Sequence, residues 1–397
     1  MRLYIEVNYF IYFYKSLKAD QLTVYIMCNS KSLIKSAFSL FLILITALIS
    51  CDHKDSNITS LNWFDKADIY IGGELGDSTT YWKNGKAISL DKKGMFANAV
   101  TVSGKDTYLA GFIAIKDSLT NNNTARAVYC KNGNIVFLTD GRTAAVATAI
   151  AVSGTDIYVA GYEYNGDKNT AEPVHSQKSI AKYWKNGIPV VLSDGHANAS
   201  ATAITVKGTD VYVAGYEKDE ISVARYWKNG KQTALKIDSN LSNGANYSEA
   251  YSIFIAGTDV YIAGTECGLA AYWKNGIPVL LAPKKSPNQS GTDNESSKAT
   301  SIAVSGQDVH VAGIQDTLAS LFHTVKYWKN GKATTLSKKP LDAKTNAFMA
   351  LNGHDVYITC TLADPAFNYQ TIVWKNTVPA ILSKETMRVT SIFAADK

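Results

Sequence analysis

Tyr183-Trp184-Lys185-Asn186-Gly187 is the stretch that decides the fold, because it recurs along most of the chain. Complete copies stand at 81–85, 226–230, 272–276 and 327–331. An altered copy at 129–133 has cysteine in place of tryptophan, and another at 373–377 begins with valine and ends with threonine. The seven copies follow one another at intervals of roughly 48 residues, which is the period of a repeat architecture.

A second recurring element precedes most of these copies. Residues 148–161 read Thr-Ala-Ile-Ala-Val-Ser-Gly-Thr-Asp-Ile-Tyr-Val-Ala-Gly. Two apolar, β-branched runs around a Ser-Gly-x-Asp turn predict a β-hairpin. Related stretches occupy 98–111, 202–215, 251–264, 300–313 and 347–360.

The Asn-Gly of the first motif predicts another hairpin, since both residues tolerate positive φ in a tight turn. One repeat therefore holds four short antiparallel strands, A to D, with no helical period between the motifs. Four such strands per repeat are typical of a β-propeller blade. We expect an all-β fold, a single seven-bladed β-propeller of four-stranded antiparallel blades over 61–397.

The ends of this region predict how the ring closes. The first copy has candidate B, C and D strands at 69–73, 79–83 and 86–90, but a poor A strand. Residues 389–394 match the A pattern and have no B, C or D strand after them. We expect this C-terminal strand to be added to the first blade, because closure removes exposed strand edges.

The N-terminal region has the parts of a secretory signal. Residues 27–50 combine Lys31 and Lys35 with an apolar run at 37–49, which is short for a membrane-spanning helix. Leu48-Ile49-Ser50-Cys51 resembles the bacterial lipobox, which implies a lipoprotein signal peptide and lipidation of Cys51. An uncleaved anchor or an ordinary signal peptide is the alternative.

The remaining N-terminal segments complete this organisation. Residues 1–26 carry Glu6 and Asp20, fit no signal sequence, and are expected to be a mis-assigned extension. Residues 51–60 are a polar tether. The resemblance implies a lipid-anchored protein of the bacterial cell envelope, at the outer membrane, on its periplasmic or its surface side.

Over 60–397 the repeats resemble uncharacterised bacterial lipoproteins, mostly from Bacteroidetes, built of Tyr-Trp-Lys-Asn-Gly and Gly-x-Asp-Val-Tyr-Val-Ala-Gly. This resemblance implies a propeller architecture and supplies no activity. The Gly-His and Trp-Asp marks of WD40 propellers and the Ser-x-Asp-x-Gly-x-Thr-Trp box of sialidases are absent from the sequence.

Charge and cysteine usage exclude several function classes. The net charge of +6 divides equally, because residues 1–50 hold five basic and two acidic residues, which leaves +3 for the rest. The repeat lysines are spread around the ring, whereas a nucleic-acid binder clusters them on one face. We therefore expect no nucleic acid partner. Cys130, Cys267 and Cys360 lack metal-ligand spacing, so we expect no metal site, and we expect no cofactor.

The recurring tryptophan and aspartate side chains have structural explanations. A buried tryptophan in each blade is expected to pack between blades, although a ring of sugar-stacking platforms is the alternative. The aspartate after each Gly-x turn suggests a calcium site, but the carboxylates lie one blade apart, and turn hydrogen bonds explain them better.

The candidate binding residues lie where the repeats differ. The B–C and D–A connections vary in length, and in an up-and-down blade both lie on one face, the usual binding face of repeat proteins. Acidic or amide residues just past strand B could form an arc at the channel mouth; the alternative is pairing with Lys182 and Arg225. The candidate binding residues are Glu163, Glu217, Glu266, Gln315, Tyr164 and Tyr247.

From these features we expect a membrane-anchored extracytoplasmic β-propeller lipoprotein that is a binding or scaffold module and not an enzyme. Its partners would be the membrane, through the acyl anchor, and a protein or glycan at the variable-loop face. The alternatives are a propeller hydrolase or lyase acting on glycans, and an envelope-assembly partner of membrane proteins.

Overall fold

The computed structural model describes residues 11–13, 24–26, 62–76, 78–116, 123–166, 178–233, 235–238, 241, 247–282, 296–316, 323–337, 346–363, 369–383 and 387–397. The chain divides into two compact units, Met1–Asp55 and Ser56–Lys397. In the first, strands β1 (Ile11–Phe13) and β2 (Val24–Ile26) pair antiparallel. The expected signal peptide, Cys51 and the 51–60 tether lie outside the described residues.

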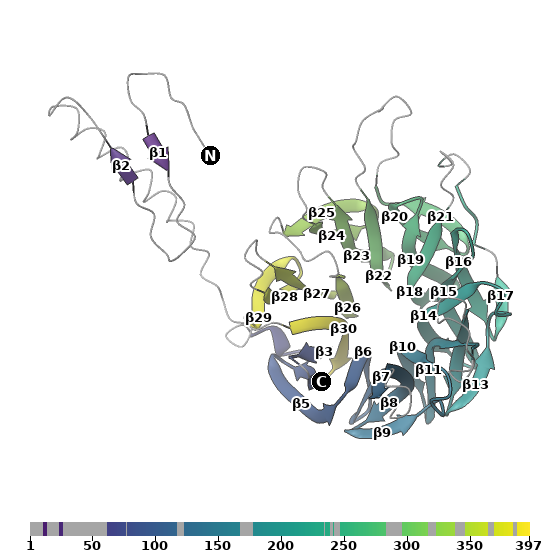
Figure 1. Cartoon of the computed structure of the whole chain (residues 1–397). Coiled ribbons are helices and arrows are strands. Elements are labelled where there is room, and N and C mark those ends of the chain that lie inside the picture. The colour runs from purple at the N-terminus through teal and green to yellow at the C-terminus, as the bar shows by residue number, and fades with distance from the viewer. Residues whose placement is uncertain are drawn as a thin grey trace, which may run out of the picture. The chain divides into compact units, whose positions relative to one another are not determined.

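The second unit is a ring of seven four-stranded antiparallel sheets, as Figure 1 shows. A short 3-10 helix, η2 (Asn62–Phe64), precedes the first strand of the ring. Each sheet is one blade, with its first strand innermost and its fourth strand at the rim. The prediction of an all-β, seven-bladed propeller is therefore confirmed. No helix in the ranges given above is long and apolar enough to cross a bilayer.

Blades are numbered here in chain order. From inner to outer strand, blade 1 is β30 (Met387–Asp396), β3 (Ala67–Leu75), β4 (Ser78–Lys83) and β5 (Lys86–Lys93). Blade 2 is β6 (Met95–Ser103), β7 (Asp106–Lys116), β8 (Asn123–Lys131) and β9 (Asn134–Phe137). Blade 3 is β10 (Ala145–Ser153), β11 (Asp156–Tyr164), β12 (Ser179–Lys185) and β13 (Ile188–Val191), and blade 4 is β14 (Asn198–Lys207), β15 (Asp210–Lys218), β16 (Ser222–Lys228) and β17 (Lys231–Thr233). Blade 5 is β18 (Ser248–Ala256), β19 (Asp259–Glu266), β20 (Leu269–Lys274) and β21 (Ile277–Leu280). Blade 6 is β22 (Ser297–Ser305), β23 (Asp308–Asp316), β24 (His323–Lys329) and β25 (Lys332–Ser337). Blade 7 is β26 (Phe348–Asn352), β27 (Asp355–Ala363), β28 (Tyr369–Lys375) and β29 (Val378–Ser383).

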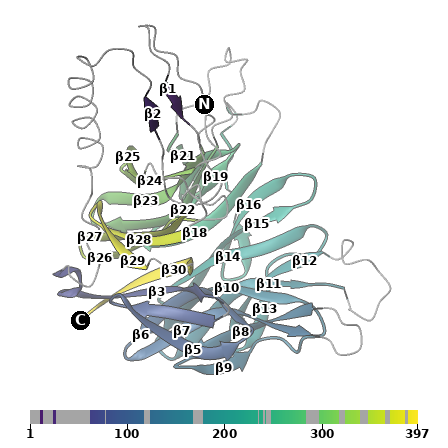
Figure 2. The same ribbon diagram turned by 60° about the vertical axis from the view of Figure 1, so that its left-hand side comes forward.

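The C-terminal strand closes the ring. β30 pairs antiparallel with β3 from Ala67↔Asp396 to Leu75↔Met387, and Figure 2 shows the two strands side by side. Blade 1 is thus assembled from both ends of the second unit, as predicted. The pairing covers the inner edge of β3, which would otherwise present unpaired backbone groups.

A bulge in the inner strand explains the Ala-Gly pair of the repeat. In blade 3 the register shifts between Ala147 and Ala149, opposite Gly161. A Cβ added at Gly161 would lie 2.0 Å from the carbonyl oxygen of Val146, so only glycine fits there. The bulged residue, Thr148, donates to the carbonyl of Ala201 in the next blade at 2.6 Å.

Tryptophan side chains pack between neighbouring blades. Trp227 of blade 4 is fully buried against Tyr158 and Ala160 of blade 3. In blade 2, Cys130 takes the tryptophan position and is buried with Tyr70 of blade 1. The packing interpretation holds for each copy that keeps its tryptophan, and the side chains concerned are Trp82, Trp184, Trp227, Trp273, Trp328 and Trp374.

Each blade also carries a polar link, which we call the turn clasp. In blades 2 to 7 it joins the two tight turns, and in blade 1 it joins the start of β3 to the β4–β5 turn. In blade 4 Asn229 has positive φ (52°), accepts from the Val211 amide at 2.8 Å, and donates to Asp210 Oδ1 at 2.8 Å. Lys228 Nζ lies 2.7 Å from Asp210 Oδ2 and over the Tyr212 ring. The clasp aspartates are Asp68, Asp106, Asp156, Asp210, Asp259, Asp308 and Asp355.

The clasp gives the recurring aspartates and lysines a structural purpose. The sequence predicted turn hydrogen bonds for each aspartate, but the partners are the Asn and Lys side chains of the adjacent hairpin. Within the described ranges no group of three or more His, Cys, Asp or Glu side chains is placed to hold a metal ion. The face carrying these turns is called the turn face, and the opposite face the loop face.

Truncating the interblade tryptophan should destabilise the ring. We expect Trp227→Ala to lower the free energy of unfolding by about 3–5 kcal/mol, because it leaves a cavity between blades 3 and 4. Chemical denaturation followed by circular dichroism measures this change. Trp227→Phe is the matched control and should lose less; equal stability of the alanine variant and the wild type would contradict the packing interpretation.

Removing the closing strand should cost cooperative unfolding. A chain ending at 386 loses the whole β30–β3 ladder and the buried side chains of Met387 and Val389. We expect a broadened thermal transition and association through the exposed β3 edge, seen by calorimetry and size-exclusion chromatography. Removal of Lys397 alone is the control, and an unchanged transition in the longer deletion would refute closure by β30.

The clasps should make stability sensitive to acid. Hydrogen bonds from Lys228 and Asn229 hold the pKa of Asp210 below its usual 3.8. Near that pH the unfolded chain binds more protons than the folded chain, so stability is present above 3.8 and is lost as the pH falls through the lower folded pKa. We expect the urea concentration at the unfolding midpoint to decrease as the pH is lowered below roughly 4. Asp210→Asn should make this decrease with pH smaller.

Candidate functional site

The repeat breaks most clearly on the loop face of blades 3 to 5. The inner-strand bulge positions of blades 2, 3, 4, 6 and 1 carry Asn98, Thr148, Thr202, Thr300 and Thr390, but blade 5 carries Tyr251. Around Tyr251 lie other tyrosines that have no counterpart in most blades. We define the tyrosine cluster as Tyr162, Tyr164, Tyr216, Tyr247 and Tyr251, together with the carboxylate of Glu249.

Hydrogen bonding and ring contacts order this cluster. The Tyr251 hydroxyl donates to Glu249 Oε2 at 2.6 Å, two residues away on β18. At the end of β11 the Tyr162 and Tyr164 rings meet edge to face, with centroids 5.8 Å apart. Most of these side chains are half-buried, and Tyr247 is 36% exposed. The cluster therefore offers both aromatic surface and polar atoms beside the inner strands.

Burial is the main influence on the pKa values of the cluster tyrosines. Burial, and then the hydroxyls of Tyr164 and Tyr216, raise the pKa of Tyr162 to about 12. Burial also raises the pKa of Tyr216, and Glu249 contributes next. For Tyr251, burial is again the largest cause of a raised pKa, followed by its hydrogen bond to Glu249. The neighbourhood thus disfavours further negative charge.

A second polar group lies in blade 6. The two oxygens of the Asp316 carboxylate are bonded to His323 Nδ1 and to Ser296 Oγ. An ionised carboxylate only accepts hydrogen bonds, so Nδ1 is the donor. Ser296 contacts Asp316 rather than His323, so the three side chains do not form a nucleophilic triad. Asp316 also helps to raise the pKa of Tyr247, after burial, Glu249 and Cys267.

The structure places the predicted acidic residues in separate blades. Lys182 Nζ lies 2.6 Å from Glu163 Oε2, and Thr143 donates to the other oxygen at 2.7 Å. Arg225 Nε lies 2.5 Å from Glu217 Oε2. Both carboxylates are therefore paired with the bases that the alternative interpretation named.

The other predicted candidates divide between the core and the cluster. Glu266 is fully buried and accepts from the amide of Asp238. Gln315 is half-buried near the end of β23 and has interaction partners. Tyr164 and Tyr247 belong to the tyrosine cluster. Cys51 lies outside the described residues, so its lipidation stays a prediction.

Sequence reasoning missed Glu249, Tyr216, Tyr251 and the His323–Asp316 pair. The signal was present in the aligned repeats, where Tyr251 stands in a column of threonines and an asparagine. Glu249 stands where the next blade has Lys298 and the previous blade has Ser200. Aligning the inner strands column by column would have found both residues.

Comparison with known proteins shows no family for this chain. No family model matches the sequence, and no curated protein sequence matches it significantly. A prolyl endopeptidase structure shares 10% identity with this chain at a TM-score of 0.47. The match covers 91% of this chain but only 56% of the endopeptidase chain. A sucrose complex of a Bombyx mori GH32 β-fructofuranosidase mutant shares 10% identity with a TM-score of 0.31, covering 92% and 94%. Another structure of that enzyme shares 9% identity with a TM-score of 0.33.

These matches correct one sequence-based prediction. We predicted that the chain is not an enzyme, and this prediction is contradicted, because the similar solved structures are enzymes. The prediction failed because it rested on missing motifs, whereas a propeller can hold reacting groups that come from separate blades. At about 10% identity the likeness extends to the fold alone and gives this chain no substrate.

Proposed function

We propose that this chain is a membrane-anchored extracytoplasmic binding propeller that holds a glycan at the tyrosine cluster on its loop face. The observation that carries the proposal is the gathering of five tyrosines from three neighbouring blades, three of these tyrosines lying near Glu249. The clasps and tryptophans have structural partners of their own, whereas this cluster departs from the repeat.

The chemistry of the cluster suits a sugar. Tyrosine rings offer flat apolar faces against which the C–H faces of a pyranose pack, and their hydroxyls donate and accept hydrogen bonds. A carboxylate accepts strongly from sugar hydroxyls. Because the Glu249 carboxylate lies near Tyr216 and Tyr247 of this half-buried cluster, neutral or amino sugars fit better than uronates, which would add a second carboxylate.

Anchoring is the second part of this proposal. Its support is the signal at 27–50 and the lipobox-like Leu48-Ile49-Ser50-Cys51. Lipidation at Cys51 would hold the propeller at the bacterial cell envelope through acyl burial. A binding module on a tether of this kind captures ligand beside the membrane.

Hydrolysis of the bound glycan is a second candidate function. Asp316, which contributes to the raised pKa of Tyr247, orients His323 as the candidate general base. The His323 side chain is 16% exposed, so a substrate group can reach it. Under this reading the same glycan would be bound at the tyrosine cluster and attacked by water at blade 6.

A glycan array with neutral, amino-sugar and uronate oligosaccharides tests binding by the full chain. We expect neutral or amino-sugar hits, and we expect Glu249→Gln and Tyr216→Ala each to weaken them by about 10-fold or more, since a hydrogen bond to a charged group is lost or a stacking face removed. Gln232→Ala on the exposed outer strand β17 is the matched control and should bind as the wild type does.

Two outcomes would contradict binding at the cluster. One is the absence of any array hit by a chain that is folded by circular dichroism. The other is binding that neither substitution changes. Chromatography of the glycan after incubation measures hydrolysis in the same samples. If hydrolysis occurs, His323→Gln should stop product formation while binding persists.

A further inference from the structure

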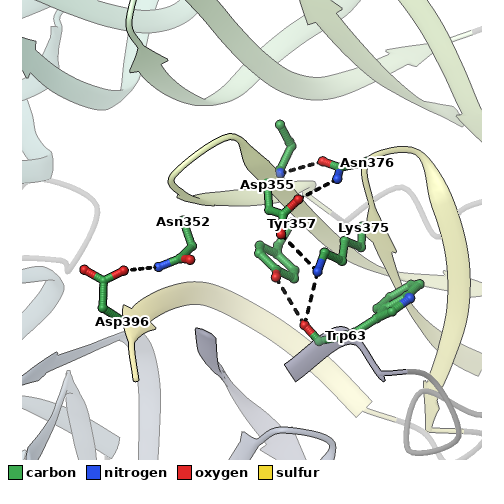
Figure 3. Close-up of polar contacts among 8 residues, drawn as sticks. Trp63, Asn352, Asp355, Tyr357, Lys375, Asn376 and Asp396 are labelled. Carbon is green, nitrogen blue, oxygen red and sulfur yellow. Dashed lines mark hydrogen bonds and ion pairs between the residues drawn. The ribbon is translucent and has the colours of Figure 1, made fainter. Parts of the chain in front are cut away.

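The chain enters the propeller from the turn face. The carbonyl oxygen of Trp63 accepts from Lys375 Nζ and from the Tyr357 hydroxyl, each at 3.3 Å (Figure 3). Lys375 is itself a clasp residue of blade 7, paired with Asp355 at 3.0 Å. β3 then begins next to the clasp residue Asp68 and runs toward the loop face. Trp63, close to where the described part of the ring begins, therefore lies beside the tight turns.

The length of the proposed tether favours this face. About ten residues separate Cys51 from Asn62, which spans at most roughly 35 Å when fully extended. A nine-residue inner strand such as β10 already covers about 30 Å between the two faces. A tether from the turn face would have to pass around the rim to place its lipid at the loop face. The turn face is thus the one nearer to an anchoring membrane.

Lysines give the turn face a positive surplus. Each clasp lysine is matched by its aspartate, but five further lysines lie in the same turns and are exposed. They are distributed over blades 1, 2, 4 and 6, so the charge is spread around the ring rather than gathered in a groove. A planar anionic surface meets such a distribution better than a single nucleic-acid strand does. The five are Lys86, Lys105, Lys207, Lys231 and Lys332.

Exposed aliphatic side chains alternate with these lysines. The position after each Asn-Gly turn, or its equivalent, carries lysine in blades 1, 4 and 6, but an apolar residue in blades 3, 5 and 7. Ile188, Ile277 and Val378 are 70%, 55% and 56% exposed there. Apolar side chains interleaved with basic ones are the composition of surfaces that lie in the headgroup region of a bilayer. Nothing in the propeller's own packing requires them to be apolar.

From the chain exit, the lysine surplus and the exposed aliphatics, we infer that the turn face docks on anionic phospholipid headgroups. Ile188, Ile277 and Val378 would enter the headgroup layer while the lysines meet lipid phosphates. The loop face then points away from the membrane and presents the tyrosine cluster to ligand. This inference rests on the proposed membrane anchoring and adds the orientation and the lipid class.

Labels on the two faces of one blade test this orientation. The full chain carries an environment-sensitive dye at Thr209→Cys on the turn face or at Glu220→Cys on the loop face, in a Cys267→Ser background. Each is mixed with vesicles containing a headgroup-bound quencher, made of phosphatidylcholine alone or with three-tenths phosphatidylglycerol. We expect several-fold stronger quenching of the turn-face label, and only with phosphatidylglycerol.

Substitutions then separate the two contributions. Ile188→Ser with Ile277→Ser, and separately Lys231→Glu with Lys332→Glu, should each reduce the turn-face quenching several-fold. All four side chains are exposed, so the fold is retained, as circular dichroism checks. Val191→Ser on the rim and Lys298→Glu on the loop face are the matched controls and should leave the quenching unchanged.

The inference is overturned if both labels are quenched equally, if the loop-face label is quenched more, or if neither pair of substitutions matters. These readings are distinct from failure of the proposed function. Acylation is read from the mass of the N-terminal peptide, and glycan binding from the array. Loss of either leaves the label result to decide the docking face.

Discussion

The ring depends on the inner strand that the C-terminus supplies to blade 1. The B strand of blade 1 has no inner neighbour in its own stretch of sequence, and an unpaired edge there would expose a row of backbone donors and acceptors. Pairing β3 with β30 covers that edge and brings residues such as Ile71 and Ile392 opposite each other. The seven blade-to-blade contacts can then be equivalent, each filled by a tryptophan or, in blade 2, by a cysteine.

Within that ring, the insistence of Tyr-Trp-Lys-Asn-Gly has a physical explanation that needs no ligand. In blade 4, Tyr226 stacks on Tyr212 with rings 6.4 Å apart, and Trp227 fills the contact with blade 3. Lys228 and Asn229 hold Asp210, while Asn229 and Gly230 supply the positive φ values of the turn. A motif whose residues are all occupied by folding is a poor place to look for binding. The departures from it are more informative.

The fold could be predicted because its signals are local. Asn-Gly turns, apolar runs and a fixed period each lie within a few residues, and pairing follows from them. The clasp was missed because each aspartate was expected to bond within its own turn, whereas Asp210 meets Asn229 across the β15–β16 pair. The pairing of Glu163 with Lys182 was foreseen because both lie on neighbouring strands of one hairpin. The tyrosine cluster needs three blades in register, which a single repeat does not reveal.

The contact at Trp63 has a mechanical consequence. The residue is held by side chains of blade 7, yet the strand that follows it belongs to blade 1. A pull on the preceding chain is therefore applied first across the joint between those two blades, where the hydrogen bonds of Lys375 and Tyr357 share the load. The ladder of β3 is loaded only after those bonds give way. The contact between blades 7 and 1, which completes the ring, would thus bear such a load before the β3 ladder does.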